Sequence, residues 1–396
     1  MRGRKAVLFF TIVIMVFQIA MGSAKAETTD ESASSDAVSS GYDTNFTSYM
    51  LCDSASGQVI AEKSGDTVMQ NAGMSQLMTE LLVLDAVNRG EIGLRDQVKV
   101  SDYAAGQGGS QIFLEPQDNY TVETLLKGLI MVAANDACVA LAERLAGSEE
   151  AFVERMNAKA QELGMTNTKF VNCTGYQESG AATSIKDMVA LCRQIVKYPL
   201  FFQFSKIWMD TIVHNDSHKT DIVNANRLVK INEKCDGMGV GSSKDTGFSI
   251  AATGKSGDSR FVFVGMGAKS SKVRSSAANA AMEEAFNNYV SKTFLKAGQM
   301  VKKDYSVQGA NKKEISLYAK DDISLLLKKG EENTVEKKLE LIQTPELPIR
   351  AGNKVGEMVL YKNGQKIASS DIVVRDDIYQ LTYLFCLREV LSAWLG

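Results

Sequence analysis

The sequence predicts a mixed α/β domain, a small β-domain after it, and an amphipathic helix at the C-terminus. Three observations carry this prediction: helical and extended apolar runs mix over 45–293, short strand-like segments fill 300–375, and residues 376–396 are apolar at helical spacing. Apolar residues make up 45% and charged residues 23% of the 396, which is enough for a sizeable core and excludes a disordered or collagen-like chain.

Residues 1–26 have the pattern of a secretory signal peptide. Basic residues at positions 2, 4 and 5 precede an apolar run over 6–21, and Ala24-Lys25-Ala26 supplies small residues before a cleavage point. The run is shorter than the roughly 20 residues that span a bilayer, although an N-terminal membrane anchor is the alternative. We expect a mature chain that begins at Glu27; loss of the four basic residues in 1–26 takes the net charge from −3 to −7. An acidic exported chain is not expected to bind nucleic acid.

The next segment, 27–44, is rich in Ser, Thr, Asp and Glu and predicts a flexible acidic tether. The α/β domain then begins with two apolar segments, 49–51 and 58–60, which flank a turn at 54–57 and predict a hairpin. The run from Met74 to Val87 is apolar on nearly every side and therefore predicts a helix inside the domain.

Further helices follow in the same domain. The segment Val122–Ala146 predicts one long helix, and Ser148 and Ser184 are placed to cap the two helices after it. Residues 261–264 predict a strand, and 277–289 predict the last helix of the domain. These elements place the α/β domain over 45–293.

The β-domain has its clearest signal at Asn363-Gly364, between the apolar segments 358–361 and 366–368. Asn-Gly favours the positive φ angles of a type I′ hairpin turn. The last segment, 376–396, carries apolar residues with Arg388 and Glu389 among them, so it is a poor membrane-spanning helix and a good interfacial one. The alternative is a helix docked on the β-domain.

The six cysteines show no paired spacing. Cys138 and Cys192 lie among apolar residues at helical spacing, so we expect free and mostly buried thiols. The only histidines, His214 and His218, have no neighbouring motif that predicts a metal, and no other cofactor is predicted. Because the sequence has no other histidine, it does not predict a conventional Ser-His-Asp triad.

Several segments, in order along the chain, carry a family resemblance. They are Ser56-Gly57-Gln58-Val59-Ile60, Gly109-Ser110-Gln111-Ile112, Thr121-Val122-Glu123-Thr124-Leu125-Leu126-Lys127-Gly128, Ala134-Asn135-Asp136-Ala137, Leu163-Gly164-Met165-Thr166-Asn167-Thr168 and Asn224-Ala225-Asn226-Arg227-Leu228. Together they resemble the serine-type D-alanyl-D-alanine carboxypeptidases, the low-molecular-mass penicillin-binding proteins, over about 45–375. The resemblance implies a penicillin-recognising (β-lactamase/transpeptidase-like) domain with an antiparallel sheet flanked by helices, and action on peptidoglycan stem peptides.

In that family, three motifs carry the chemistry. A Ser-x-x-Lys pair supplies the nucleophile and a lysine that takes its proton. A Ser-x-Asn segment supplies a second hydroxyl and an amide, and a Lys-Thr-Gly strand supplies a cation for the terminal carboxylate of the substrate.

This sequence departs from all three motifs. The first aligns on Gly73 and Gln76, so the nucleophile is absent and a neutral amide replaces the base. The second aligns on Ala133 and Asn135, which keeps only the asparagine. The third aligns on Gly239-Val240-Gly241, which removes the lysine and threonine and keeps the last glycine.

Two possible substitutes do not restore the chemistry. Ser75 lies about 200° around the helix from position 73 and has Met78, not lysine, three residues later. The segment Lys244-Asp245-Thr246-Gly247 resembles the third motif but is out of register with the spacing that follows it.

The residues that remain to contact a substrate are Asn135, Gly239, Gly241 and Ser243, with backbone N–H groups of Gly73 and Ser243 as donors. The sequence therefore predicts an exported, catalytically silent homologue. Its expected partners are a peptidoglycan stem peptide or an envelope protein, and the outer face of the cytoplasmic membrane through 376–396. The alternatives are a working hydrolase with rebuilt chemistry and a purely structural envelope protein.

Overall fold

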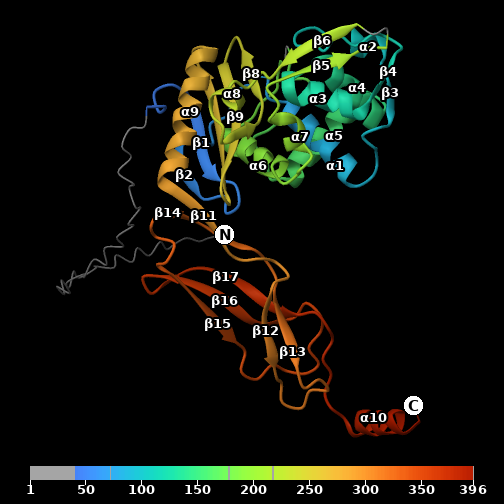
Figure 1. Ribbon diagram of the computed structural model, residues 1–396, viewed down its shortest axis with the longest axis vertical. Coiled ribbons are helices and arrows are strands. Elements are labelled where there is room, and N and C mark those ends of the chain that lie inside the picture. Colours follow the sequence, from blue (N-terminus) through green and yellow to red (C-terminus); the bar gives the residue numbers. More distant parts are fainter. Residues whose placement is uncertain (1–40, 72, 177–178, 216–217, 396) are drawn as a thin grey trace, which may run out of the picture. The chain divides into compact units, whose positions relative to one another are not determined.

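The computed structural model describes residues 41–71, 73–176, 179–215 and 218–395. The expected signal peptide and most of the expected tether lie outside these residues. The first domain is organised around a six-stranded antiparallel sheet with the order β2–β1–β10–β9–β7, and β8 pairs with β9 beside β7 (Figure 1). Its strands are β1 (Ser48–Asp53), β2 (Val59–Lys63), β7 (Cys235–Gly237), β8 (Val240–Ser243), β9 (Gly247–Ser256) and β10 (Ser259–Ala268).

Helices cover both faces of this sheet, and α9 lies along the face opposite to α6 (Figure 1). The helices are α1 (Gln76–Asn88), α2 (Asp102–Ala105), α3 (Val122–Val132), α4 (Asn135–Ala146), α5 (Glu149–Glu162), α6 (Ile185–Ile195), α7 (Phe201–Ser205), α8 (Leu228–Ile231) and α9 (Ser271–Asn288). Two small hairpins accompany them: β3 (Gln97–Lys99) with β4 (Asn119–Thr121), and β5 (Met209–Val213) with β6 (Lys219–Val223).

Two apolar cores result, one on each face of the sheet. The core on the α1 side includes Met78, Leu84 and Leu129, and the core on the α9 side includes Phe263 and Ala281. α1 is buried on nearly every side, as its sequence predicted, because α3, α4, α5 and α6 all pack against it.

The single long helix predicted over 122–146 is wrong. α3 ends at Val132, and α4 begins at Asn135 after a two-residue break at Ala133 and Ala134, in which Ala133 has a φ of +56°. Alanine favours a continuous helix, so local sequence gave no sign of the break. Tertiary contacts hold it, since the Asn135 N–H donates to the Ser110 carbonyl at 2.7 Å.

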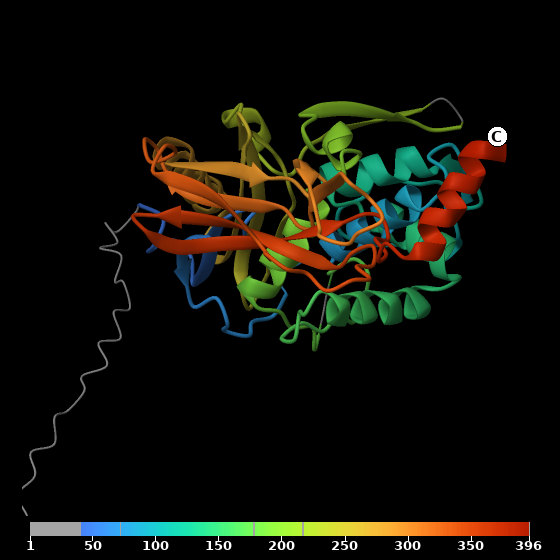
Figure 2. The same ribbon diagram turned by 90° about the horizontal axis from the view of Figure 1, so that it is seen from below.

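The second domain contains a five-stranded antiparallel sheet with the order β12–β13–β17–β16–β15 and a two-stranded sheet of β11 and β14 (Figures 1 and 2). The strands are β11 (Tyr289–Leu295), β12 (Met300–Tyr305), β13 (Ile315–Ala319), β14 (Ile323–Lys328), β15 (Val335–Leu341), β16 (Lys354–Lys362) and β17 (Gln365–Val374). Asn363 and Gly364, with φ of +52° and +77°, make the predicted turn between β16 and β17.

The structure places the ends of the expected domains differently. Tyr42, expected in the tether, is fully buried against the α9 side of the sheet. The strand β11 starts at Tyr289 and pairs with β14, so the chain enters the β-domain before residue 293.

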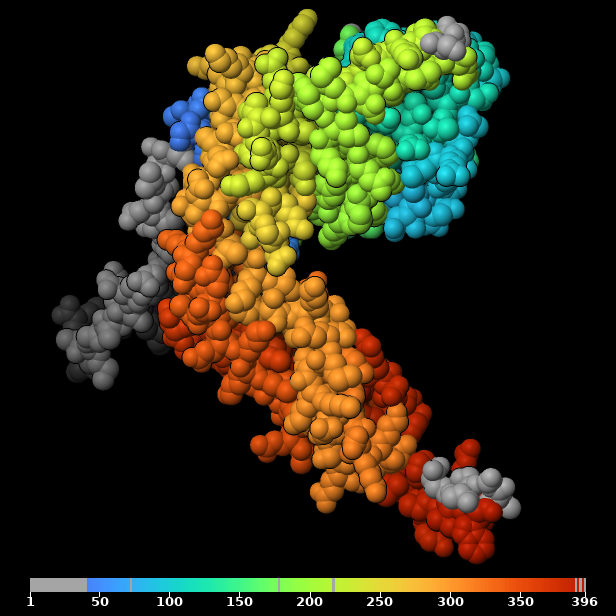
Figure 3. All heavy atoms as spheres, viewed as in Figure 1, coloured from blue at the N-terminus to red at the C-terminus, as the bar shows by residue number. Residues whose placement is uncertain are grey.

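The C-terminal helix α10 covers Tyr383–Leu395 and is shorter than the predicted 376–396. Ile378 is fully buried in the β-domain, where it forms a backbone bridge with Ile349. By contrast, the side chains of Tyr383, Leu384 and Trp394 are 82%, 75% and 87% exposed. Figure 3 draws this C-terminal segment as red spheres. None of the described helices combines the length and apolar character needed to cross a membrane.

Candidate functional site

Gly73, which the sequence predicts at the nucleophile position of the family, lies three residues before α1 and has a φ of +75°. A Cβ at this position would lie 3.3 Å from the Ser242 backbone nitrogen and 3.4 Å from the Gly241 Cα. The backbone of β8 therefore faces Gly73 directly. Any side chain at 73 would be strained, because L-residues rarely adopt this left-handed conformation.

Gln76, which the sequence predicts at the position of the lysine of the Ser-x-x-Lys motif, begins α1 and is buried. Its Nε2 donates to the Ala133 carbonyl at 2.9 Å and to Asn135 Oδ1 at 2.8 Å. Asn135 Nδ2 in turn donates to the Gly108 carbonyl at 2.6 Å. The two amides thus bind each other and the surrounding backbone. An uncharged amide pair therefore occupies the position at which the sequence alignment predicts the family's base.

The loop that receives Asn135 is held by a buried carboxylate. Asp136 accepts from the N–H groups of Ile112 at 3.2 Å and Leu114 at 3.0 Å. Burial raises the pKa of Asp136, and the hydrogen bonds from Leu114 and Ile112 oppose that rise. Asp136 was not among the residues that we predicted at the site, and it positions the loop beside Asn135.

The third motif lies at the start of β8. A Cβ at Gly239 would lie 3.3 Å from Leu77 Cδ2. An apolar residue of α1 therefore borders the position at which the sequence predicts the lysine of the Lys-Thr-Gly motif. The carbonyl of Gly241 accepts from Arg274 Nη1 at 3.3 Å. We predicted the backbone N–H of Ser243 as a donor on this strand, but the backbone atom nearest to a Cβ at Gly73 is the nitrogen of Ser242. The Ser243 hydroxyl instead accepts from the Thr246 N–H at 2.9 Å, inside the turn between β8 and β9.

The two possible substitutes do not form a Ser-Lys pair with each other. Ser75 is fully buried and its hydroxyl accepts from Asn71 Nδ2 at 2.8 Å. Lys244 is exposed in the turn between β8 and β9. The structure therefore brings together Gly73, Gln76 and Asn135 with β8, and no displaced Ser-Lys pair is found at this cleft among the described residues.

A small cavity of about 10 Å³ lies beneath these groups, room for about one water molecule. It is lined by residues of α1, α3 and β8, including Gln76, Glu80, Met131 and Gly239. Glu80 is 3% exposed, and burial raises the pKa of its carboxyl to about 8. No lysine or arginine of the described residues forms an ion pair with it. Our sequence reasoning missed Glu80, although an acidic residue inside an apolar helix was the signal.

Solved structures define the class to which this fold belongs. Penicillin binding protein 5 from Haemophilus influenzae superimposes with a TM-score of 0.75 at 26% identity, over 85% of this chain and 98% of that chain. Penicillin binding protein 6B from Escherichia coli gives 0.67 at 27% identity, over 83% and 95%. The fold is thus a penicillin-binding-type α/β domain followed by an all-β domain, as the sequence predicted.

The family follows from sequence comparison. The D-alanyl-D-alanine carboxypeptidase family matches residues 32–270, and the C-terminal domain of penicillin-binding protein 5 matches 289–380. D-alanyl-D-alanine carboxypeptidase DacF of Bacillus subtilis is 35% identical over 88% of this chain and 89% of its own length. DacC of Escherichia coli is 29% identical over 83% of each. This chain belongs to the D-alanyl-D-alanine carboxypeptidase family.

Proposed function

We propose that this chain is a catalytically silent member of its family that acts at the peptidoglycan without cleaving it. The observation that carries the proposal is the Gln76–Asn135 amide pair, which lies beside a glycine at the nucleophile position. Residue 73 has no hydroxyl to attack a substrate carbonyl, and residue 76 has no basic nitrogen to take a proton. These two positions therefore cannot form an acyl-enzyme. Backbone donors can stabilise an oxyanion, but no nucleophile produces one here.

The same geometry supports non-covalent binding. The Ser242 nitrogen lies 3.3 Å from a Cβ built at Gly73, and β8 pairs with β9 along one edge only among the described strands. An extended peptide can add to such a strand edge through main-chain hydrogen bonds. Because the relatives by name are D-alanyl-D-alanine carboxypeptidases, the proposed ligand is a peptidoglycan stem peptide, and an envelope protein is the second candidate.

The proposed location is outside the cytoplasm, peripheral on the outer face of the cytoplasmic membrane. It rests on the signal-peptide pattern of 1–26 and on the exposed apolar residues of α10. N-terminal sequencing of the secreted protein is expected to begin at Glu27, and a secreted chain that retains Met1 contradicts cleavage of a signal peptide after Ala26.

The test of silence is intact-mass spectrometry after incubation of the full chain with excess penicillin. We expect no adduct, because the described cleft has no nucleophile. An active D-alanyl-D-alanine carboxypeptidase treated in parallel serves as the control for acylation. A stoichiometric adduct on Ser75 or any other cleft residue overturns the proposal and supports a hydrolase with rebuilt chemistry.

The test of binding uses immobilised muropeptides with and without the terminal D-Ala-D-Ala. Retention that depends on the D-Ala-D-Ala end supports a stem-peptide ligand. A matched pair of variants separates cleft binding from other adhesion. Asn135→Ala removes the amide that contacts Gln76 and the Gly108 carbonyl. The control, Asn157→Ala, removes an amide of α5 that hydrogen-bonds the backbone of Phe170. No retention of the wild type favours an envelope protein as partner or a purely structural role.

A further inference from the structure

Two of the buried cysteines contact each other across the helical part of the α/β domain. Cys138 lies on α4, one turn after Asn135, and Cys173 lies in the segment between α5 and α6. Both side chains are fully buried. Cys138 Sγ donates to the Cys173 carbonyl at 3.0 Å. The neighbouring Cys138 side chain, together with burial, raises the pKa of Cys173 well above its usual value.

The backbone of Cys173 is fixed independently of the Cys138 thiol. The Cys173 N–H donates to Glu149 Oε1 at 3.0 Å, and its carbonyl accepts a second hydrogen bond from Thr79 Oγ1 at 2.9 Å. Loss of the Cys138 thiol proton would therefore leave the Cys173 carbonyl with a donor. Rotation of the two side chains about their Cα–Cβ bonds is the movement available to bring the sulfurs together, because the main chain is already held in place.

We propose that Cys138 and Cys173 are a disulfide-forming pair, which oxidises as the exported chain folds. The location of the reaction rests on the proposed export, since disulfides form and persist outside the cytosol. The oxidant is a disulfide, either of a thiol oxidase or of a small molecule such as oxidised glutathione. One cysteine thiolate attacks this disulfide to give a mixed disulfide and one released thiol, and the other cysteine then displaces the second thiol. The pair loses two electrons and two protons, and the oxidant becomes two thiols.

The bond would tie together two segments that border the cleft. A Cβ at Gly109 would lie 2.7 Å from Asn135 Nδ2 and 3.1 Å from the Tyr176 ring, so the loop 108–110 lies between Asn135 and the segment that contains Cys173. A link from Cys138 to Cys173 thus braces α4 and the 173–176 segment on both sides of this loop. Because both thiols are fully buried, oxidation precedes closure of the core, and the folded reduced protein reacts slowly.

The test counts thiols in the full chain, refolded in a buffer of reduced and oxidised glutathione and then alkylated in denaturant. We expect two fewer alkyl groups than in the reduced control, with Cys138 and Cys173 joined in one peptide of a non-reducing digest. The oxidised form is also expected to melt higher, by on the order of 5 °C. Alkylation of all six cysteines, or a bond between Cys52 and Cys192, overturns the proposal.

Three variants sharpen the result. Cys138→Ser and Cys173→Ser should each abolish the bond and free the remaining partner for alkylation. Cys235→Ser removes a buried cysteine of the core on the α9 side and should leave the bond intact. Refolding in vitro does not depend on export. A bond formed there, together with protein that is found only inside the cell, would therefore count against export and not against the pair.

Discussion

At the scale of single residues, Gly73 combines two obstacles to chemistry. It lacks a side chain, and its backbone has the left-handed conformation beside β8. We predict that Gly73→Ser alone gives no penicillin adduct, because Gln76 has no basic nitrogen to take the serine proton. We also predict a loss of stability of about 1–2 kcal/mol from the strained φ, measured by denaturant unfolding.

Gly90 provides the control for that strain. Its φ is +70°, and no atom lies within 4 Å of a Cβ placed there. Gly90→Ser should cost a similar amount of stability, and any excess cost in Gly73→Ser reports contact with β8.

The combined variant Gly73→Ser, Gln76→Lys, Ala133→Ser and Gly239→Lys is expected to be the first to form a penicillin adduct. An adduct on the single Gly73→Ser variant contradicts this account.

Glu80 makes the stability of the protein depend on pH. Burial raises the pKa of its carboxyl in the folded state to about 8, so the folded protein holds this proton more tightly than the unfolded chain. Its contribution is full below the unfolded pKa near 4.3 and is lost as the pH rises toward 8. We predict that Glu80→Gln raises the free energy of unfolding relative to wild type, increasingly from pH 5 to pH 8.

The measurement for Glu80 is urea unfolding of both proteins at several pH values. Each pH unit within the window contributes at most about 1.4 kcal/mol to the difference. Glu115→Gln, which changes an exposed carboxyl, controls for the general effect of charge. Parallel stability curves for wild type and Glu80→Gln would show that Glu80 ionises normally in the folded protein.

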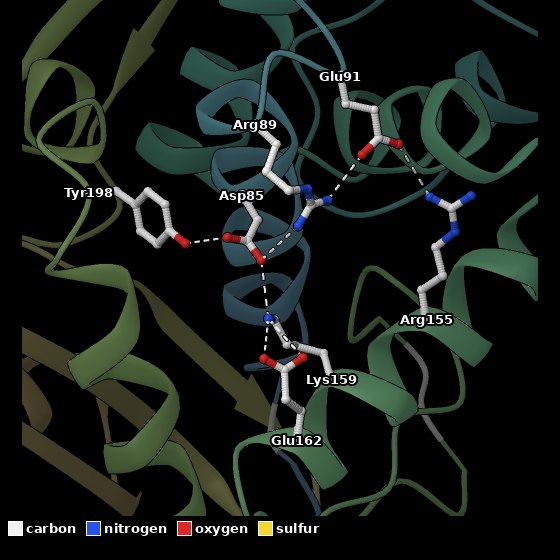
Figure 4. Close-up of polar contacts among 7 residues, drawn as sticks. All are labelled: Asp85, Arg89, Glu91, Arg155, Lys159, Glu162 and Tyr198. Atoms are coloured by element: carbon white, nitrogen blue, oxygen red, sulfur yellow. Dashed lines mark hydrogen bonds and ion pairs between the residues drawn. The ribbon is translucent and has the colours of Figure 1, made fainter. Parts of the chain in front are cut away.

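At the scale of elements, the C-terminal end of α1 is joined to α5 by a polar cluster that also includes Tyr198 (Figure 4). Lys159 Nζ lies 3.1 Å from Asp85 Oδ2 and 2.9 Å from Glu162 Oε1. Tyr198 also donates to Asp85. Burial alone would raise the pKa of Asp85, but the hydrogen bonds from Tyr198 and Lys159 outweigh it and lower the pKa. The cluster fixes the helix that begins at the cleft.

We predict that Asp85→Asn destabilises the protein by about 1 kcal/mol at neutral pH, since it removes a partly buried charge pair. A lowered folded pKa means that this stability is present above the unfolded pKa and is lost as the pH falls through the folded pKa. The difference from wild type should therefore vanish in acid. Asp66→Asn, in an ion pair whose aspartate is 71% exposed, should change little. Equal effects of the two variants in thermal melts would contradict a special role for the cluster.

At the scale of the whole molecule, the structure changes how the membrane proposal is best tested. Removal of 376–396 would also remove Ile378, which is buried in the β-domain. A chain that stops at Thr382 keeps that contact and loses α10. We predict that this truncated chain fails to float with liposomes and that the full chain floats. The double variant Leu384→Glu and Trp394→Glu should behave like the truncation, because both side chains are exposed. Continued flotation of the truncated chain contradicts the membrane role of α10.

The sequence by itself determined the class of fold and the hairpin turn at Asn363-Gly364. It also supplies the identities of Gly73 and Gln76, on which the proposal of a silent protein rests. Each depends on local pattern or on residue identity, which need no knowledge of distant contacts. Only the tertiary structure decided the break at Ala133, the amide pair of Gln76 and Asn135, the burial of Glu80 and the contact between Cys138 and Cys173. Each of these is made by residues from different elements. Packing between segments far apart in the chain sets such contacts, and local preference does not encode them.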